Sequence, residues 1–96
     1  MLYIAICVDK PESVEKRLAN RPAHLAYLQS LGAKVKAGGA TMADDLKTPT
    51  GTMLIFEGES AAEIEAILAT DPYALAGLFE SVVVKPWRQA VGQMLV

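Results

Sequence analysis

The strongest constraint in the sequence is an unbroken apolar run over residues 2–8, rich in β-branched and aromatic side chains. Successive side chains of a strand point to opposite faces, so a strand with this pattern buries both faces. The run therefore predicts a central strand of a sheet. Residues 52–57 and 81–85 predict two more apolar strands, and Pro86 is expected to close the second of them.

A fourth, more polar strand is predicted over residues 34–37, where lysines alternate with apolar residues. Alternating charge on a short strand is typical of an edge or a solvated face. Gly38 and Gly39 are expected to end this strand, and residues 40–49 read as a polar loop. The sequence therefore predicts four strands in all.

The segment 12–31 has the apolar spacing of a helix, carried by Val14, Leu18, Leu25, Leu28 and Leu31. Asp9 and Pro11 suit the start of this helix, and Gly32 suits a left-handed stop. Pro22 lies inside the segment, and proline clashes with the helical carbonyl four residues earlier. We expect a kink or break near Asn20 and Arg21, with Pro22 opening a second helical piece.

A second helical region is predicted between the last two apolar strands. Ser60 and Glu63 form a capping box for a helix whose apolar stripe is Ala61, Ile64, Ile67 and Leu68. Asp71 and Pro72 then begin a short helical turn that reaches Phe79.

The resulting order, β-α-β-β-α-β, is the ferredoxin-like plan of the α+β class, with both helices on one face of a four-stranded antiparallel sheet. We expect residues 1–96 to form a single domain. The chain is 52% hydrophobic, and its apolar strands would leave the second sheet face both bare and hydrophobic. Such a face marks an interaction site, and the simplest partner is a second copy packed sheet on sheet. We therefore predict a homodimer, a dimeric α/β barrel.

Composition excludes several classes of protein. A net charge of -2 and a pI near 5.3 argue against a nucleic-acid partner. One cysteine and one histidine permit neither an internal disulfide nor a Cys-rich zinc site, and no motif for a metal or other cofactor is present. No run is long enough to span a membrane, and the apolar N-terminal run lacks the basic flank of a signal peptide. A cytoplasmic protein without a membrane partner is expected.

The candidate chemistry centres on His24, because imidazole is the side chain that ordinarily changes charge near neutral pH. On a helix, Arg17, Arg21 and His24 fall along one line, where two guanidiniums beside an imidazole suit an anion such as a carboxylate or phenolate. The alternative is that the arginines are solvated and that His24 is a hydrogen-bonded structural residue.

Asp71 and Cys7 each have a structural explanation as well. Asp71 stands where a helix N-cap belongs, although a carboxylate near His24 would also fix the imidazole tautomer. Cys7 lies inside the first strand and reads as a small buried residue rather than a nucleophile. Residue spacing alone leaves the role of Asp71 open.

Three stretches carry a family resemblance. Residues 14–25 contain Arg-x-x-x-Arg-x-x-His-Leu, and residues 71–87 contain Asp-Pro-Tyr, Ala-Gly and Lys-Pro-Trp. Gly39-Ala40 and Gly51-Thr52 form the third stretch. Together they resemble the YciI-like proteins, small bacterial members of the dimeric α/β-barrel group, in which a proline usually occupies the position of Ala40.

The resemblance implies a sheet-packed dimer and a pocket with a His-Asp acid/base dyad, here His24 and Asp71. It places five further residues in substrate binding: Arg17, Arg21, Gly39, Thr52 and Tyr73. The activity it implies is that of a cofactor-free lyase or isomerase, such as a dehydrochlorinase acting on a chlorinated hydroxyquinol. The substrate would be a small anionic or phenolic metabolite, and the alternative is a non-catalytic dimeric ligand-binding or accessory protein.

Overall fold

The computed structural model describes residues 1–95 and contains one four-stranded antiparallel sheet in the order β2-β3-β1-β4. Strand β1 (Leu2–Asp9) is central and lies between β3 (Pro49–Glu57) and β4 (Phe79–Trp87). Strand β2 (Val35–Met42) is an edge. The predicted α+β, ferredoxin-like fold is confirmed.

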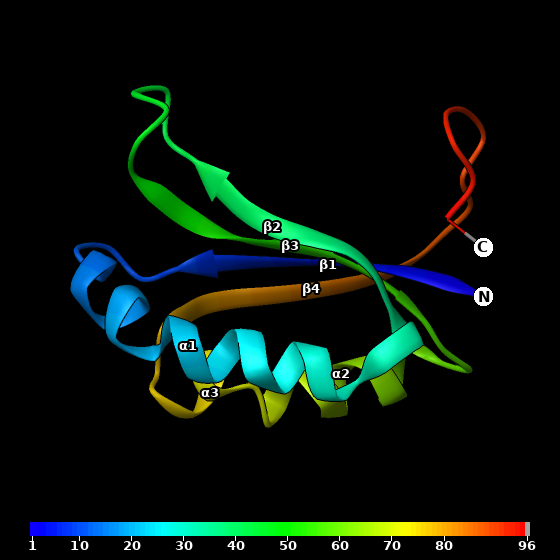
Figure 1. Ribbon diagram of the computed structural model, residues 1–96, viewed down its shortest axis with the longest axis horizontal. Helices are drawn as coiled ribbons and strands as arrows, with labels where there is room; N and C mark the ends of the chain where they lie inside the picture. Colours follow the sequence, from blue (N-terminus) through cyan, green and yellow to red (C-terminus); the bar gives the residue numbers. More distant parts are fainter. Residues whose placement is uncertain (96) are drawn as a thin grey trace.

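The helices lie on one side of this sheet (Figure 1). They are α1 (Val14–Ser30), α2 (Ala61–Ala69) and the four-residue α3 (Pro72–Leu75), with a short 3-10 turn, η1 (Gly32–Lys34), before β2. The core between the layers is built from alternate strand residues and the inner face of α2, namely Tyr3, Ala5, Cys7, Leu54, Phe56, Ile64 and Leu68. Within residues 1–95, no helix has the length and hydropathy needed to cross a membrane.

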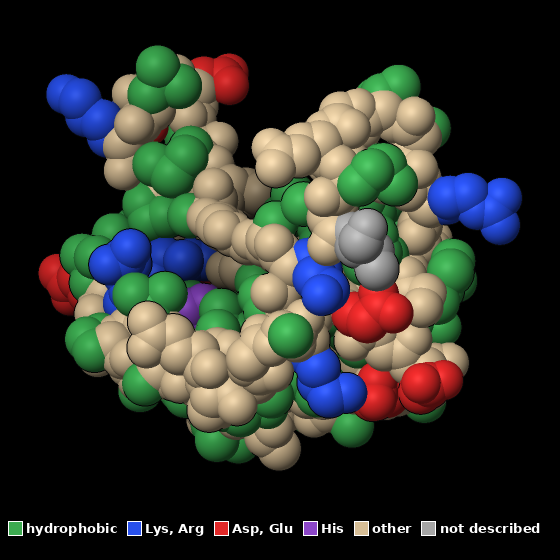
Figure 2. Space-filling model, turned by 45° about the vertical axis from the view of Figure 1, so that its right-hand side comes forward, with side chains coloured by type: hydrophobic (Ala, Val, Ile, Leu, Met, Phe, Trp, Pro, Cys, Tyr) green, Lys and Arg blue, Asp and Glu red, His purple; other side chains and the backbone are tan. Residues whose placement is uncertain are grey.

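The opposite face of the sheet carries apolar side chains that no helix covers. Ile6, Val8 and Val83 share this face and are 37%, 42% and 47% exposed. The β2–β3 hairpin and the chain after β4 both rise on this side (Figure 1). In Figure 2 they form two projections with a hollow between them. The expected apolar sheet face is therefore present in the single chain.

Helix α1 differs from its prediction in two ways. It runs without a break through Pro22, because that residue lies on the solvent side, where water can satisfy the carbonyl left without a backbone donor. Leu18 and Leu25 are 59% and 39% exposed, whereas Leu28 and Leu31 pack against the core, so only the last part of the expected apolar stripe faces inward. The most buried residues of α1 are Arg17 and His24.

The start of α1 also differs from the expectation. Ser13, not Asp9, is the N-cap residue, and its side chain makes no capping bond. Asp9 instead forms an ion pair with Arg17, at 2.8 Å. A side chain that neutralises a buried guanidinium is then not available for capping.

The edge strand β2 continues through Gly38 and Gly39 rather than ending there. These residues pair with Leu54 and Met53 of β3. A Cβ at Gly38 would collide with Leu54 Cδ2, so glycine is needed for close packing and not for chain reversal. Pro86 similarly lies within β4, an edge strand that tolerates a missing donor.

The other helix boundaries follow the sequence closely. Ser60 is the N-cap of α2 and accepts a hydrogen bond from the Glu63 backbone N–H at 3.1 Å. Asp71 is the N-cap of α3, which is shorter than expected because Gly77 turns the chain at φ +74° and β4 then begins. Gly32 has the predicted left-handed conformation, at φ +59°.

Candidate functional site

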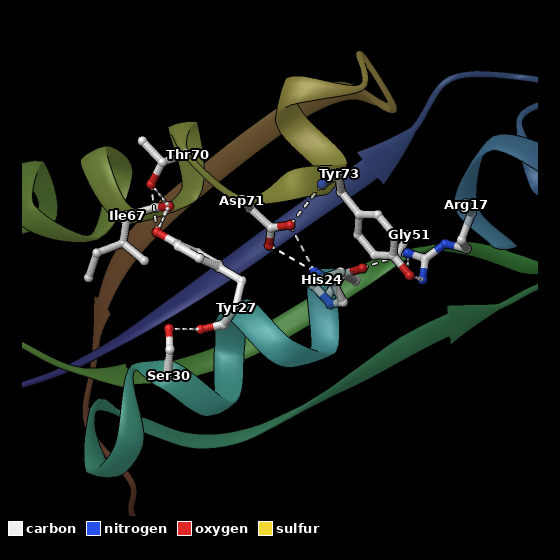
Figure 3. Close-up of polar contacts among 10 residues, drawn as sticks. Arg17, His24, Tyr27, Ser30, Gly51, Ile67, Thr70, Asp71 and Tyr73 are labelled. Atoms are coloured by element: carbon white, nitrogen blue, oxygen red, sulfur yellow. Dashed lines mark hydrogen bonds and ion pairs between the residues drawn. The ribbon is translucent and has the colours of Figure 1, made fainter. Parts of the chain in front are cut away.

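The centre of the candidate site is a contact between α1 and the start of α3. The His24 Nδ1 atom lies 2.9 Å from both carboxylate oxygens of Asp71 (Figure 3). His24 is 5% exposed and Asp71 is fully buried. The structure thus brings together two residues that are 47 positions apart in the sequence.

The hydrogen bonds define the tautomer that the imidazole needs. Asp71 also accepts a bond from the Tyr73 backbone N–H, at 2.9 Å, as the N-cap of α3. An ionised carboxylate only accepts, so His24 Nδ1 is the donor in this pair. In the neutral ring Nε2 then carries the lone pair, and Nε2 makes no hydrogen bond within residues 1–95.

Tyr73 forms a flat support for the imidazole. The two ring centroids are 3.8 Å apart and the ring planes differ by 14°. Tyr73 is fully buried, and burial raises the pKa of its phenol, so the hydroxyl stays protonated at neutral pH. The ring is held from the other end by Arg17, whose Nη1 lies 3.4 Å from the hydroxyl.

Arg17, on α1, links this tyrosine to strands β1 and β3. Its Nη2 donates to the Gly51 carbonyl at 2.6 Å and to the Thr52 hydroxyl at 2.5 Å, and its Nε donates to Asp9 at 2.8 Å. The side chain is 4% exposed. Buried guanidiniums require this kind of pairing, because an unpaired buried charge is strongly unfavourable.

A cavity of about 160 Å³ lies beside the imidazole, between α1 and the β2–β3 side of the sheet. Its wall is basic at Arg17 and Arg21, mostly apolar elsewhere, and includes backbone of β2; the lining residues are Arg17, Arg21, His24, Leu25, Leu28, Val35, Gly38, Gly39, Ala40, Thr52, Leu54 and Tyr73. Figure 2 shows the histidine, in purple, partly covered and beside basic side chains. A base next to a partly open, mostly apolar cavity with one accessible cation suits proton transfer on a small anion.

The predicted binding residues all line this cavity, but in different ways. Arg21 is exposed and makes no hydrogen bond or ion pair within residues 1–95, so its guanidinium is available to a ligand. Thr52 is 2% exposed, and its hydroxyl already accepts from Arg17. Gly39 contributes only its backbone to the cavity wall. A side chain at this position would face the open side of the sheet.

Two residues around the site, Gly38 and Asp9, have other roles than the sequence analysis predicts for them. Both glycines line the cavity, but only a Cβ at Gly38 would meet Leu54, so Gly38 is the one whose missing side chain matters for packing. Asp9 neutralises Arg17 from the end of β1. Its signal in the sequence is its position directly after a fully apolar strand, which places a carboxylate at the edge of the core.

Cys7 is near Asp71, but its thiol is expected to be unreactive. Burial, together with the carboxylates of Asp71 and Asp9, raises the pKa of its thiol to about 12. A thiol that stays protonated is a poor nucleophile. Among residues 1–95, no group of three or more His, Cys, Asp or Glu side chains is arranged to hold a metal ion.

The fold agrees with the family match of the sequence. Residues 1–88 match the YCII-related domain, so the chain belongs to the YCII-related family. The protein named YciI of Escherichia coli is 42% identical over 96 residues, covering 93% of this chain and 98% of that protein. An uncharacterized protein of Haemophilus influenzae is 35% identical with the same coverage.

A solved structure with high similarity is the 5-chloro-2-hydroxyhydroquinone dehydrochlorinase TftG of Burkholderia phenoliruptrix, in complex with 2,5-dihydroxybenzoquinone. It is 39% identical to this chain, the TM-score is 0.85, and the match covers 94% of this chain and 96% of that one. An antibiotic biosynthesis monooxygenase homologue from Chloroflexus aurantiacus, at 11% identity and a TM-score of 0.57, shares the fold alone.

Proposed function

We propose that this protein is a cofactor-free enzyme that uses His24 as a general acid/base on a small phenolic or quinone-like metabolite. The observation that carries the proposal is the His24–Asp71 pair at 2.9 Å with Nε2 left to a cavity. Support for the substrate class comes from the similar TftG structure, whose ligand is a hydroxylated quinone.

In the proposed reaction, Nε2 of His24 removes a proton from a ring hydroxyl of the substrate. The Nδ1–H bond to Asp71 holds the ring in the tautomer that makes this possible, and the carboxylate stabilises the imidazolium that forms. The resulting phenolate carries a negative charge that the guanidinium of Arg21 can bind. With a chlorinated substrate, the imidazolium of His24 then returns this proton to the ring carbon that bears chlorine, which gives a keto tautomer. Loss of chloride from that carbon, with release of a second hydroxyl proton to solvent, leaves the quinone, and the net change is a loss of HCl.

The cavity restricts the substrate to a small molecule. Its volume of about 160 Å³ admits a single substituted six-membered ring, and its apolar walls at Leu28, Val35 and Leu54 favour an aromatic or quinonoid one. General acid/base catalysis of this kind contributes roughly 10²–10⁴-fold to a rate.

The test is chloride release from 5-chloro-2-hydroxyhydroquinone, followed together with binding of 2,5-dihydroxybenzoquinone by calorimetry. The wild-type chain is expected to bind the quinone and release chloride, whereas the His24→Ala variant should bind and release none. If His24→Ala turns over at the wild-type rate, His24 is not the base. If the wild-type chain binds the quinone without any turnover, the alternative of a ligand-binding or accessory protein is favoured.

We further propose that the protein is a homodimer through the open sheet face. The support is the apolar surface at Ile6, Val8 and Val83, which in a monomer would remain in contact with water. Light scattering at micromolar concentration should give twice the mass of one chain, and a monomer would contradict the proposal. A cytoplasmic location stays a prediction.

A further inference from the structure

Arg17 lies in the cavity wall, yet its hydrogen-bonding capacity is largely used by the protein. Its four contacts go to Asp9, Gly51, Thr52 and Tyr73. An arginine has five N–H donors in a fixed fork, so one of them remains. This geometry differs from that of an arginine that waits for an anionic ligand.

The charge of Arg17 is also already compensated. Asp9 Oδ2 lies 2.8 Å from its Nε, and the side chains of both residues are less than one-tenth exposed. A substrate anion at Arg17 would therefore meet a neutral pair rather than a free cation. Arg21 is four residues further along α1, is exposed, and lacks such a partner within residues 1–95.

The Arg17 contact with Tyr73 leads directly to the imidazole. The guanidinium carbon lies 4.7 Å from the centroid of the tyrosine ring, and Nη1 is 3.4 Å from its hydroxyl. The same ring stacks on His24. The second torsion of a histidine side chain is soft, so the plane of the imidazole depends on what packs against it.

We propose that Arg17 is a positioning residue that acts through Tyr73: it holds the tyrosine ring, and the ring holds the plane of His24 so that Nε2 points into the cavity. The anionic group of the substrate is then bound by Arg21. This inference rests on the proposed function, because it assigns roles around a His24 that acts on a ligand in the cavity.

The experiment uses the single imidazole of the chain as its own reporter. Long-range ¹H–¹⁵N correlation spectra separate the protonated from the lone-pair nitrogen of His24 without any ligand. The variants are Arg17→Lys, which keeps the charge beside Asp9 but loses the fork, and Tyr73→Phe, which keeps the ring but loses the hydroxyl. Their double variant completes a cycle, and thermal melts report the folded fraction.

We expect both single variants to move the His24 nitrogen signals away from a pure Nδ1–H form. Arg17→Lys should add less in the Tyr73→Phe background than in the wild type, because the contact with the hydroxyl is already gone and only the contact with the ring face remains. Should Arg17→Lys fail to fold, Tyr73→Phe alone must still move the signals. Independent, additive changes in the double variant would overturn the proposal, as would unmoved signals in both single variants.

Binding of 2,5-dihydroxybenzoquinone separates the two arginines. Arg21→Gln should weaken binding about tenfold or more, whereas Arg17→Lys should change the Kd by less than about twofold. A tenfold weaker Kd in Arg17→Lys with unmoved His24 signals would make Arg17 a ligand-binding residue. If the wild-type chain does not bind this quinone, the proposed substrate class fails, while the nitrogen spectra still decide the positioning role.

Discussion

The substitution Asp71→Asn tests the role of the buried carboxylate with little change in shape. The side-chain oxygen can still cap α3 by accepting from the Tyr73 backbone N–H, since asparagine is an N-cap residue comparable to aspartate. The other oxygen becomes an NH₂ group that faces His24 Nδ1, now 2.9 Å away. The oxygen that stays is also 2.9 Å from Nδ1, but it already accepts from the Tyr73 backbone N–H. Two N–H groups repel at this distance, so the ring is expected to shift its proton to Nε2. The lone pair then faces the amide, and the cavity loses its base.

The cost in stability should be small and the cost in rate large. A charge-assisted hydrogen bond is replaced by a neutral one, a difference of about 1 kcal/mol. For a domain of this length, that lowers Tm by roughly 4–8 °C. Turnover should fall by roughly 10⁴-fold, the scale observed when an amide replaces the carboxylate that orients a catalytic histidine.

The assay combines chloride release, thermal melts and the ¹⁵N spectrum of the single imidazole. The control is Asp71→Ala, which removes the cap and leaves the Nδ1–H without an acceptor, and which should therefore cost about 2–4 kcal/mol. If the Asp71→Asn variant keeps the wild-type tautomer, or loses activity only in proportion to its loss of folded protein, the assigned role of the carboxylate is wrong.

Three further predictions concern the rest of the chain. Gly38→Ala should cost about 1–3 kcal/mol by forcing a Cβ into Leu54, whereas the matched control Gly39→Ala, whose Cβ meets nothing within 4 Å, should leave the melting curve close to wild type. Burial raises the pKa of Cys7 from about 9 to about 12, so on raising the pH the unfolded chain loses the thiol proton before the folded chain does. Between pH 9 and pH 12 the unfolding free energy should therefore fall by up to about 1.4 kcal/mol per pH unit. That loss should be smaller in Cys7→Ala, and an unchanged pH dependence would contradict it. Finally, Val83→Lys on the open sheet face should shift the mass measured by light scattering from dimer to monomer, with His24 signals unmoved; a dimer that persists would place the interface elsewhere.

The fold could be predicted largely from the sequence because its signals are local. Apolar runs, the Ser60–Glu63 capping box and Gly32 each act within a few residues, and the structure confirms the elements they predict. The end of the edge strand could not be predicted, because Gly38 is required by the Leu54 side chain across the strand pair and not by a turn.

Helix α1 shows why periodicity identified only part of the inward face. The leucines have helical spacing, but two polar residues, Arg17 and His24, also face inward. They can do so because Asp9 and Tyr73 contact Arg17, and Asp71 contacts His24. These partners come from distant parts of the chain, so no local window contains them. The pairing of Asp71 with His24, which spacing left open, likewise exists only in the folded chain.

The inward polar face of α1 has a consequence for engineering the protein. Arg17 and His24 hold this helix to the sheet and to α3 through hydrogen bonds that a leucine could not replace. With leucine, buried Asp9 would lose its ion pair, and buried Asp71 would keep only the Tyr73 backbone N–H as a donor. A library screened only for expression or heat resistance would therefore retain both residues. Retention of both residues in such a screen would show that the selected variants fold. Only a direct measurement of turnover would show whether they are still active.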